Sequence, residues 1–151
     1  MMRLMQLVLA TALAAAAASA PAQLFGRQPE LLEPEKAFRI SARPLDARAI
    51  EVEFKIAEGY YMYRERFSFA SESGQPLAGV EIPPGKPKED AFFGKSEIFR
   101  DWVRIRVPVS ARDAESGSII LQVTSQGCSD KGVCYIPITQ SVRVPLPRGK
   151  S

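Results

Sequence analysis

Two cysteines are the residues of this chain whose type and spacing most clearly suggest chemistry. Cys128 and Cys134 are the two cysteines among the 151 residues, and Gly132 lies between them. Such a pair could form a structural disulfide, supply part of a metal site, or exchange electrons as a reversible dithiol. The chain contains no histidine, which excludes Ser-His-Asp and Cys-His catalysis and leaves a poor zinc site. Binding of Cu(I) stays an alternative, because the thiolates of cysteine and the thioethers of methionine can coordinate this ion.

As a structural crosslink the pair is poorly placed. In immunoglobulin-like sandwiches the disulfide usually joins strands that are distant in sequence. On the chain-entropy model, so short a ring stabilises a fold by roughly 2.4 kcal/mol, against about 4.7 kcal/mol for a 100-residue loop. The spacing predicts the end of a hairpin, in which Cys128 closes one strand and Cys134 opens the next. Three functions stay open: a redox-active domain, a secreted binding module with an inert disulfide, and an exported protein that binds copper or zinc, which the absence of histidine weakens.

Alternating apolar and polar residues predict the strands that must position this pair. In Ile50–Ile56 apolar side chains alternate with charged ones. Further runs with this period are 38–40, 103–109, 121–123 and 142–144, and Tyr61, Tyr63, Phe67 and Phe69 share one parity. No window of a dozen residues after the N-terminal region has a helical period. We therefore predict an all-β fold, an immunoglobulin-like antiparallel β-sandwich, with a small β-barrel as the alternative.

The N-terminal region has the composition of a secretory signal peptide. Arg3 precedes the apolar run Leu4–Ala17, and small residues follow it. A retained N-terminal anchor is the alternative. Export would bring the chain to a compartment in which disulfides form and persist. The predicted organisation is a signal peptide over 1–22, an extension over 23–36, the sandwich domain over 37–146 and a tail or linker over 147–151.

Charge near the cysteines is sparse. The formal net charge is +3, and basic residues are interspersed with acidic ones, so no basic stripe indicates nucleic acid. Lys131 is the only cation beside the cysteines in sequence, and Asp130 offsets it. We expect thiols that are not strongly acidic in the isolated domain, with a reactivity that depends on the docked partner.

Two aromatic segments could cover a sulfur pair. Phe92 and Phe93 interrupt a segment of charged residues and glycine, which we expect to form a loop. Successive side chains of an extended segment point to opposite faces, so one of the two is predicted to cover something. Tyr61 and Tyr63 directly follow a turn. Ordinary core packing is the alternative explanation for these aromatic residues.

Three segments carry a family resemblance: YYMYR at 60–64, EDAFFGKSEIFRD at 89–101 and SQGCSDKGVCYIP at 125–137. In this order and spacing they resemble the N-terminal periplasmic domain of the bacterial thiol:disulfide interchange protein DsbD family. The resemblance implies an immunoglobulin-like fold. It also implies a periplasmic domain that takes reducing equivalents from a membrane-linked thioredoxin-like donor. The implied recipients are oxidised thioredoxin-like proteins, such as disulfide isomerases and cytochrome-maturation proteins, and no cofactor or metal is expected.

The resemblance also implies roles for individual residues. Cys134 would form the mixed disulfide with a partner, and Cys128 would resolve it. Asp90–Gly94 would form a cap loop, in which Phe92 shields the sulfurs and Phe93 stands where tyrosine is common. The remaining residues expected to line the site are Tyr61, Tyr63 and Tyr135.

The family domain is normally followed by a membrane-embedded domain and a C-terminal thioredoxin-like domain. This chain ends at Ser151, so a fragment of a longer membrane protein and a free-standing version with a separate reductant are both compatible with it. In both cases the prediction is a thiol:disulfide oxidoreductase, whose membrane association depends on a longer chain.

Overall fold

A computed structural model describes residues 30–147, and the account below concerns the compact unit that begins at Leu31. The predicted signal peptide over 1–22 therefore lies outside the described residues. Among the described residues, no helix has the length and apolar character needed to cross a bilayer. The elements are α1 (Pro34–Ala37), β1 (Phe38–Asp46), β2 (Ala49–Ile56), β3 (Tyr60–Tyr63), the 3-10 turn η1 (Arg64–Arg66), β4 (Ser68–Ser71), β5 (Lys86–Asp90), β6 (Gly94–Phe99), β7 (Trp102–Pro108), α2 (Ala111–Ser116), β8 (Ser118–Ser125), β9 (Gly127–Ser129), β10 (Val133–Cys134) and β11 (Ile138–Pro145).

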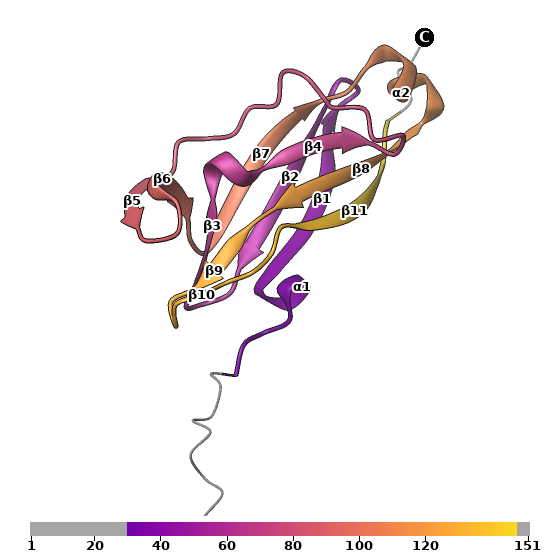
Figure 1. Ribbon diagram of the computed structural model, residues 1–151. Coiled ribbons are helices and arrows are strands. Elements are labelled where there is room, and N and C mark those ends of the chain that lie inside the picture. Colours follow the sequence, from indigo (N-terminus) through magenta and orange to yellow (C-terminus); the bar gives the residue numbers. More distant parts are fainter. Residues whose placement is uncertain (1–29, 148–151) are drawn as a thin grey trace, which may run out of the picture. The chain divides into compact units, whose positions relative to one another are not determined.

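Antiparallel sheets form two layers around one main core (Figure 1). The first layer is the sheet β1-β2-β7, and the second contains the sheets β11-β8-β4 and β10-β9-β3-β6-β5. The strands predicted from alternation are present. In each of them the apolar side chains share one face, which packs on the core. Val52 and Phe54 of β2 are fully buried, and they pack in the same core as Leu121 and Val123 of β8. The predicted antiparallel sandwich is confirmed.

The second layer carries the cysteine hairpin as a continuation of its own strands. Only Gln126 separates β8 from β9, Tyr135–Pro137 separates β10 from β11, and η1 with Phe67 separates β3 from β4. Each strand of the sheet β11-β8-β4 thus extends into a strand of the sheet β10-β9-β3-β6-β5. This continuity places the cysteines at one end of the sandwich.

One predicted alternation is wrong. Tyr61 and Tyr63 belong to a small cluster with Cys128, whereas Phe67 and Phe69 pack in the main core. The 3-10 turn Arg64–Arg66 interrupts the extended chain and resets which side faces the core. Within β3 itself both faces are buried, since Tyr60 and Met62 join the main core.

A short helix and a hairpin loop connect strands of the sandwich. Residues 111–116 form α2, in which Ser110 accepts from the Asp113 N–H and Gly117 ends the helix at a φ of 75°. The loop expected around Phe92 and Phe93 is present as the three-residue turn 91–93 at the tip of the β5–β6 hairpin. Gly94, which begins β6 after this turn, has a φ of 66° in the left-handed region that glycine adopts readily.

Candidate redox site

Cys128 and Cys134 lie directly opposite one another in the β9–β10 hairpin and form a disulfide. Their Cα atoms are 4.0 Å apart. In the next pair of the ladder, the Tyr135 N–H donates to the Gly127 carbonyl at 3.0 Å. The cysteines therefore occupy a non-hydrogen-bonded position, where facing residues of antiparallel strands approach most closely. The predicted hairpin is confirmed, and its backbone alone brings the two sulfurs within bonding range.

The two sulfurs differ in access. Cys128 is completely buried, in a cluster that we call the sulfur cluster, formed with Tyr61, Tyr63 and Ile98. Cys134 packs against this cluster but is only partly buried. A thiol must be reachable to attack a disulfide. Cys134 is therefore the sulfur that a partner can approach more easily.

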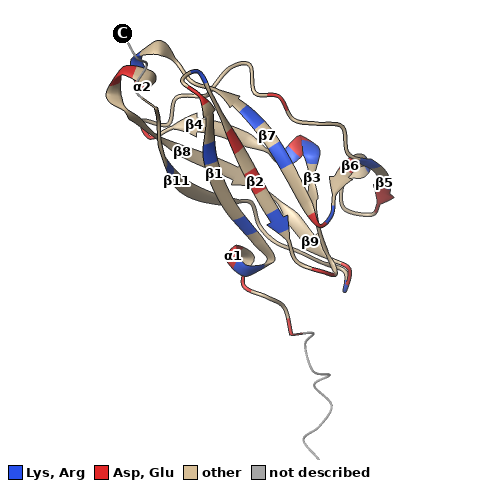
Figure 2. Ribbon diagram, turned by 180° about the vertical axis from the view of Figure 1, so that it is seen from behind, with Lys and Arg blue, Asp and Glu red and all other residues tan. Residues whose placement is uncertain are grey.

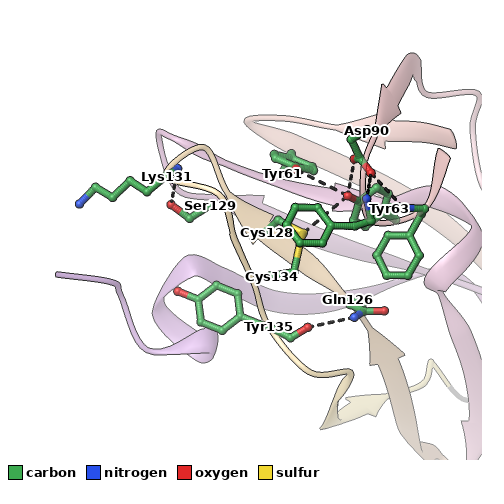
Figure 3. Close-up of a disulfide and its surroundings, with 11 residues drawn as sticks. Tyr61, Tyr63, Asp90, Gln126, Cys128, Ser129, Lys131, Cys134 and Tyr135 are labelled. Atoms are coloured by element: carbon green, nitrogen blue, oxygen red, sulfur yellow. Dashed lines mark hydrogen bonds between the residues drawn. A yellow bond between two sulfur atoms is a disulfide. The ribbon is translucent and has the colours of Figure 1, made fainter. Parts of the chain in front are cut away.

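The Tyr63 hydroxyl is the polar centre of the sulfur cluster (Figure 3). It donates to Asp90 Oδ2 at 2.5 Å, and its oxygen lies 3.6 Å from Cys128 Sγ and 3.5 Å from the Tyr61 hydroxyl. Burial and the hydrogen bond to Asp90 raise the pKa of Tyr63 above its ordinary value. The side chain next to the buried sulfur therefore stays an uncharged phenol.

Asp90 fixes the tip of the β5–β6 hairpin. Its Oδ1 accepts from the backbone N–H groups of Phe92 and Phe93, each at 2.9 Å. Burial alone would raise the pKa of Asp90, but the hydrogen bonds from Tyr63 and from these two N–H groups outweigh it and lower the pKa. The carboxylate is thus charged at neutral pH, and it ties the tip to the sulfur cluster.

The two consecutive phenylalanines of the tip have different environments. The Phe93 ring packs edge-on against the Tyr63 ring, with centroids 4.6 Å apart, and joins the sulfur cluster. The Phe92 side chain is 51% exposed. One aromatic residue of the turn thus packs inward, as predicted for one of the two, and its neighbour is exposed. Shielding of the sulfurs by Phe92 stays a prediction.

Sequence reasoning missed the cations around the cluster. Lys88 and Arg100 each lie 5.0 Å from the centre of the Tyr61 ring, and Arg66 lies 4.1 Å from that of Phe93. Asp130 also pairs with Arg100 at 2.8 Å, so Lys131 is not the only cation near the cysteine hairpin. No sequence signal identifies a partner that is 30 residues away and reached only through the sheet order.

Tyr135 lies on the other side of the hairpin from Tyr61 and Tyr63 (Figure 3). Its ring packs in the main core, 5.6 Å from the Phe38 ring and 6.2 Å from the Tyr60 ring. Its hydroxyl donates to the Leu32 carbonyl at 2.6 Å. Burial, followed by the hydrogen bond with Tyr60, raises the pKa of Tyr135 to about 12. Tyr135 thus anchors the chain after Cys134 and is not a member of the sulfur cluster.

The arrangement has the elements that thiol–disulfide exchange needs: a partly accessible sulfur, a buried sulfur next to it, and a hairpin whose Phe93 packs against the cluster of the buried sulfur. Within residues 30–147, no three or more histidine, cysteine, aspartate or glutamate residues are grouped so that they could hold a metal ion. The family model described as "Thiol:disulfide interchange protein DsbD, N-terminal" matches residues 28–146.

The chain belongs to the DsbD N-terminal family. The DsbD protein of Ralstonia nicotianae is 47% identical over 117 residues, which cover 76% of this chain and 19% of that protein. The chain thus spans about a fifth of the length of this curated relative.

Solved structures of DsbD N-terminal domains have the same fold. The reduced form of the Neisseria meningitidis DsbD N-terminal domain superposes with a TM-score of 0.64 at 30% identity, covering 76% of this chain and 90% of that one. The same domain in a complex with the PilB N-terminal domain gives a TM-score of 0.62 at 31% identity, covering 76% and 87%. These matches confirm the immunoglobulin-like sandwich predicted from the sequence.

Proposed function

We propose that this chain is a periplasmic thiol:disulfide oxidoreductase domain that passes reducing equivalents to oxidised thioredoxin-like proteins through Cys128 and Cys134. The observation that carries the proposal is the asymmetry of the pair: facing cysteines on adjacent strands, with Cys128 buried and Cys134 partly accessible. Family membership supports the reaction class, because thiol:disulfide interchange is the activity in the family's name.

The reaction divides the work between the two sulfurs. In the reduced domain the Cys134 thiolate attacks one sulfur of the partner's disulfide, and the partner's other sulfur leaves as a thiolate. Cys128 then gives up its proton and attacks the Cys134 sulfur of the mixed disulfide. The Cys128–Cys134 bond forms, and the partner leaves as a dithiol that has gained two electrons. A reduced thioredoxin-like donor restores the domain by the reverse sequence.

The surroundings of Cys128 suit a resolving thiol. A completely buried sulfur cannot meet a partner, but it needs to reach only the cysteine opposite it. The Tyr63 hydroxyl, 3.6 Å from the Cys128 sulfur, and the Tyr61 ring keep this sulfur within the sulfur cluster.

The proposed partners follow from the relatives. A DsbD N-terminal domain forms a complex with a second protein domain, that of PilB. For this chain we propose thioredoxin-like partners of the same kind: disulfide isomerases and cytochrome-maturation proteins as recipients, and a membrane-linked thioredoxin-like domain as donor. Their place, and that of this domain, would be the periplasm.

Trapping tests the proposal and the division of roles. The probe is an oxidised disulfide isomerase of the thioredoxin fold, mixed with reduced Cys128→Ser or reduced Cys134→Ser and analysed on a non-reducing gel with mass spectrometry. Cys128→Ser should accumulate a mixed disulfide through Cys134, because no resolving thiol is left. Cys134→Ser should accumulate little. The reverse pattern would exchange the two roles.

A redox titration distinguishes the alternative, a binding module with an inert disulfide. If the pair stays oxidised at potentials at which thioredoxin-like proteins are reduced, and the reduced chain unfolds, the binding module is the correct function. If the reduced chain keeps its fold and titrates in the thioredoxin range, the disulfide is reversible, as proposed.

A further inference from the structure

We propose that Arg100 is a positioning residue for the sulfur pair, because its guanidinium fastens the tip of the β9–β10 hairpin to the end of β6 in the same sheet. By doing so it holds Cys134 opposite Cys128 after the disulfide opens. The inference rests on the proposed exchange function and concerns the equilibrium of that exchange.

The cysteine hairpin needs an anchor outside its own backbone ladder. β10 consists of Val133 and Cys134 alone, and it is the edge strand of its sheet, paired with β9 on one side. β9 is held on its other side by β3, whereas within the described part of the chain β10 has no second strand beside it. Once the disulfide is reduced, the covalent link between the strands is gone. The position of Cys134 then depends on the residues before and after β10.

Arg100 supplies the anchor at the tip. It directly follows β6, and its Nη2 and Nη1 donate to Asp130 Oδ1 and Oδ2 at 2.8 and 3.0 Å. Nη1 also lies 3.3 Å from the Tyr60 carbonyl, and the guanidinium lies 5.0 Å from the Tyr61 ring centre. The Asp130 N–H donates to the Gly59 carbonyl at 2.8 Å. The tip is thus joined to Gly59, which directly precedes β3, and to Arg100, which directly follows β6. These two strands supply the tyrosines and Ile98 of the sulfur cluster.

The fork geometry of arginine is what this contact uses. A guanidinium presents parallel N–H groups that match both oxygens of a carboxylate and fix its orientation, whereas an ammonium acts as a point charge. The carboxylate belongs to Asp130, which directly follows β9, the strand that contains the buried Cys128. Fixing its plane therefore constrains the turn that leads to Cys134.

A second arginine of the chain offers a matched control. Arg104 donates from Nε to Glu53 Oε2 at 2.7 Å and lies 4.7 Å from the Trp102 ring centre. It thus also combines an ion pair with a contact to an aromatic ring. It lies on the sheet β1-β2-β7, whose strands carry charges of both signs (Figure 2). Its loss should lower stability to a similar extent without touching the cysteine hairpin.

The expected effect is on the redox equilibrium. The chain's dithiol and oxidised glutathione react to the chain's disulfide and two molecules of reduced glutathione, and the constant depends on how closely the two thiols are held together. Without the fork the reduced hairpin gains freedom, so the disulfide becomes less favourable relative to the dithiol. The reduction potential of the pair should become less negative, which makes the domain a weaker reductant.

The experiment measures this equilibrium constant for the full chain in glutathione buffers, for Arg100→Met, Arg100→Lys, Asp130→Asn and Arg104→Met. We expect Arg100→Met to lower the constant roughly threefold to tenfold, the range of a partly exposed bidentate ion pair. Arg100→Lys and Asp130→Asn should lower it less, because each keeps part of the contact. Arg104→Met should stay within about twofold of the unchanged chain.

The outcomes separate the inference from the function. If the unchanged chain exchanges with glutathione but Arg100→Met and Asp130→Asn match Arg104→Met, the positioning role is wrong and the proposed function stands. If the unchanged chain does not exchange at all, the proposed function fails and the inference fails with it. Should Arg100→Met not fold, Asp130→Asn decides, since its side chain is isosteric with aspartate.

Discussion

The two halves of the second layer are built from continuous strands, yet they differ in what covers their outer face. In the half β11-β8-β4 the outward side chains include Thr124 and Thr139, whose hydroxyl oxygens lie 2.8 Å apart at the surface. In the half β10-β9-β3 the corresponding face carries Tyr61, Tyr63 and Cys128, which are buried. The difference is the β5–β6 hairpin, which adds Phe93 over the second half. A redox site thus needs one extra hairpin outside a sandwich whose core is otherwise ordinary.

The largest expected effect concerns the close approach of the two layers behind the cysteines. At Gly127 an added Cβ would lie 2.4 Å from the Phe38 ring and 2.5 Å from the Tyr61 carbonyl. We expect Gly127→Ala to lower the free energy of unfolding by about 3 kcal/mol, because overpacking forces the backbone to move. Urea denaturation measures the loss.

Gly132→Ala is the control for this prediction. Gly132 lies in the same hairpin at a φ of 79°, and nothing lies within 4 Å of its added Cβ. Its replacement should cost about 1–2 kcal/mol, from the left-handed backbone alone. Equal losses at the two positions would show that the close packing at Gly127 has no special cost.

The second prediction breaks the polar link between the β5–β6 hairpin and the sulfur cluster. Tyr63→Phe removes the hydroxyl that donates to Asp90 and lies 3.6 Å from Cys128 Sγ. We expect a loss of about 2 kcal/mol, typical of a hydrogen bond to a charged group. The disulfide should also react faster with a phosphine reductant, because the tip is held less firmly. Tyr61→Phe, whose hydroxyl does not contact Asp90 directly, should change the reduction rate much less.

The same link predicts a dependence on acid pH. The pKa of Asp90 in the fold lies below its ordinary value of 3.8, so the fold prefers the carboxylate. The stabilisation is therefore complete above that value and is lost as the pH falls through the lower pKa of the fold. Disulfide reduction by the phosphine, expressed relative to Asp90→Asn, should accelerate below about pH 4. A constant ratio from pH 6 to pH 3 would show that the Asp90 charge does not hold the hairpin.

How far the sequence predicted these features depends on the range of the interactions. The prediction of β2 was correct because apolar and polar residues alternate without interruption over Ile50–Ile56, and the apolar face is buried. The parity from Tyr61 to Phe69 was wrong because a three-residue 3-10 turn leaves no signature in an aromatic-rich segment. The prediction of the cysteine hairpin was correct, since the two cysteines are close in sequence and the turn between them contains Gly132 at a φ of 79°.

The candidate site shows the same division. Family resemblance brought together Cys134, Tyr63 and Asp90, which the sequence separates by dozens of residues. It could not identify Arg100 as the partner of Asp130, or Gly127 as the point where no side chain fits, because both depend on the order of strands in the sheet. Tyr135 was expected to line the site, yet its partly buried ring packs against the main core.

The two phenylalanines of the hairpin tip sharpen the comparison further. Phe93→Ala should lower the free energy of unfolding by about 1.5 kcal/mol, less than a fully buried phenylalanine, because its ring packs on Tyr63 at the edge of the cluster. Phe92→Ala should change stability by less than about 0.5 kcal/mol, since the side chain is 51% exposed. If Phe92 shields the sulfurs, its loss should nevertheless accelerate reduction by small thiols. An unchanged rate would remove the shielding role and leave the cover to Phe93.

The last prediction concerns the core side of the hairpin, where we expect no effect on the rate of disulfide reduction. Tyr135→Phe removes the hydroxyl that donates to the Leu32 carbonyl at 2.6 Å and keeps the ring against Phe38 and Tyr60. We expect a loss of about 1–2 kcal/mol, the net contribution of the neutral hydrogen bonds with the Leu32 carbonyl and with Tyr60. The rate of disulfide reduction should not change, because these bonds lie on the side away from the sulfur cluster. A faster reduction of the disulfide in Tyr135→Phe would contradict this expectation. It would show that access to Cys134 is controlled from the core side of the hairpin as well as from the β5–β6 hairpin.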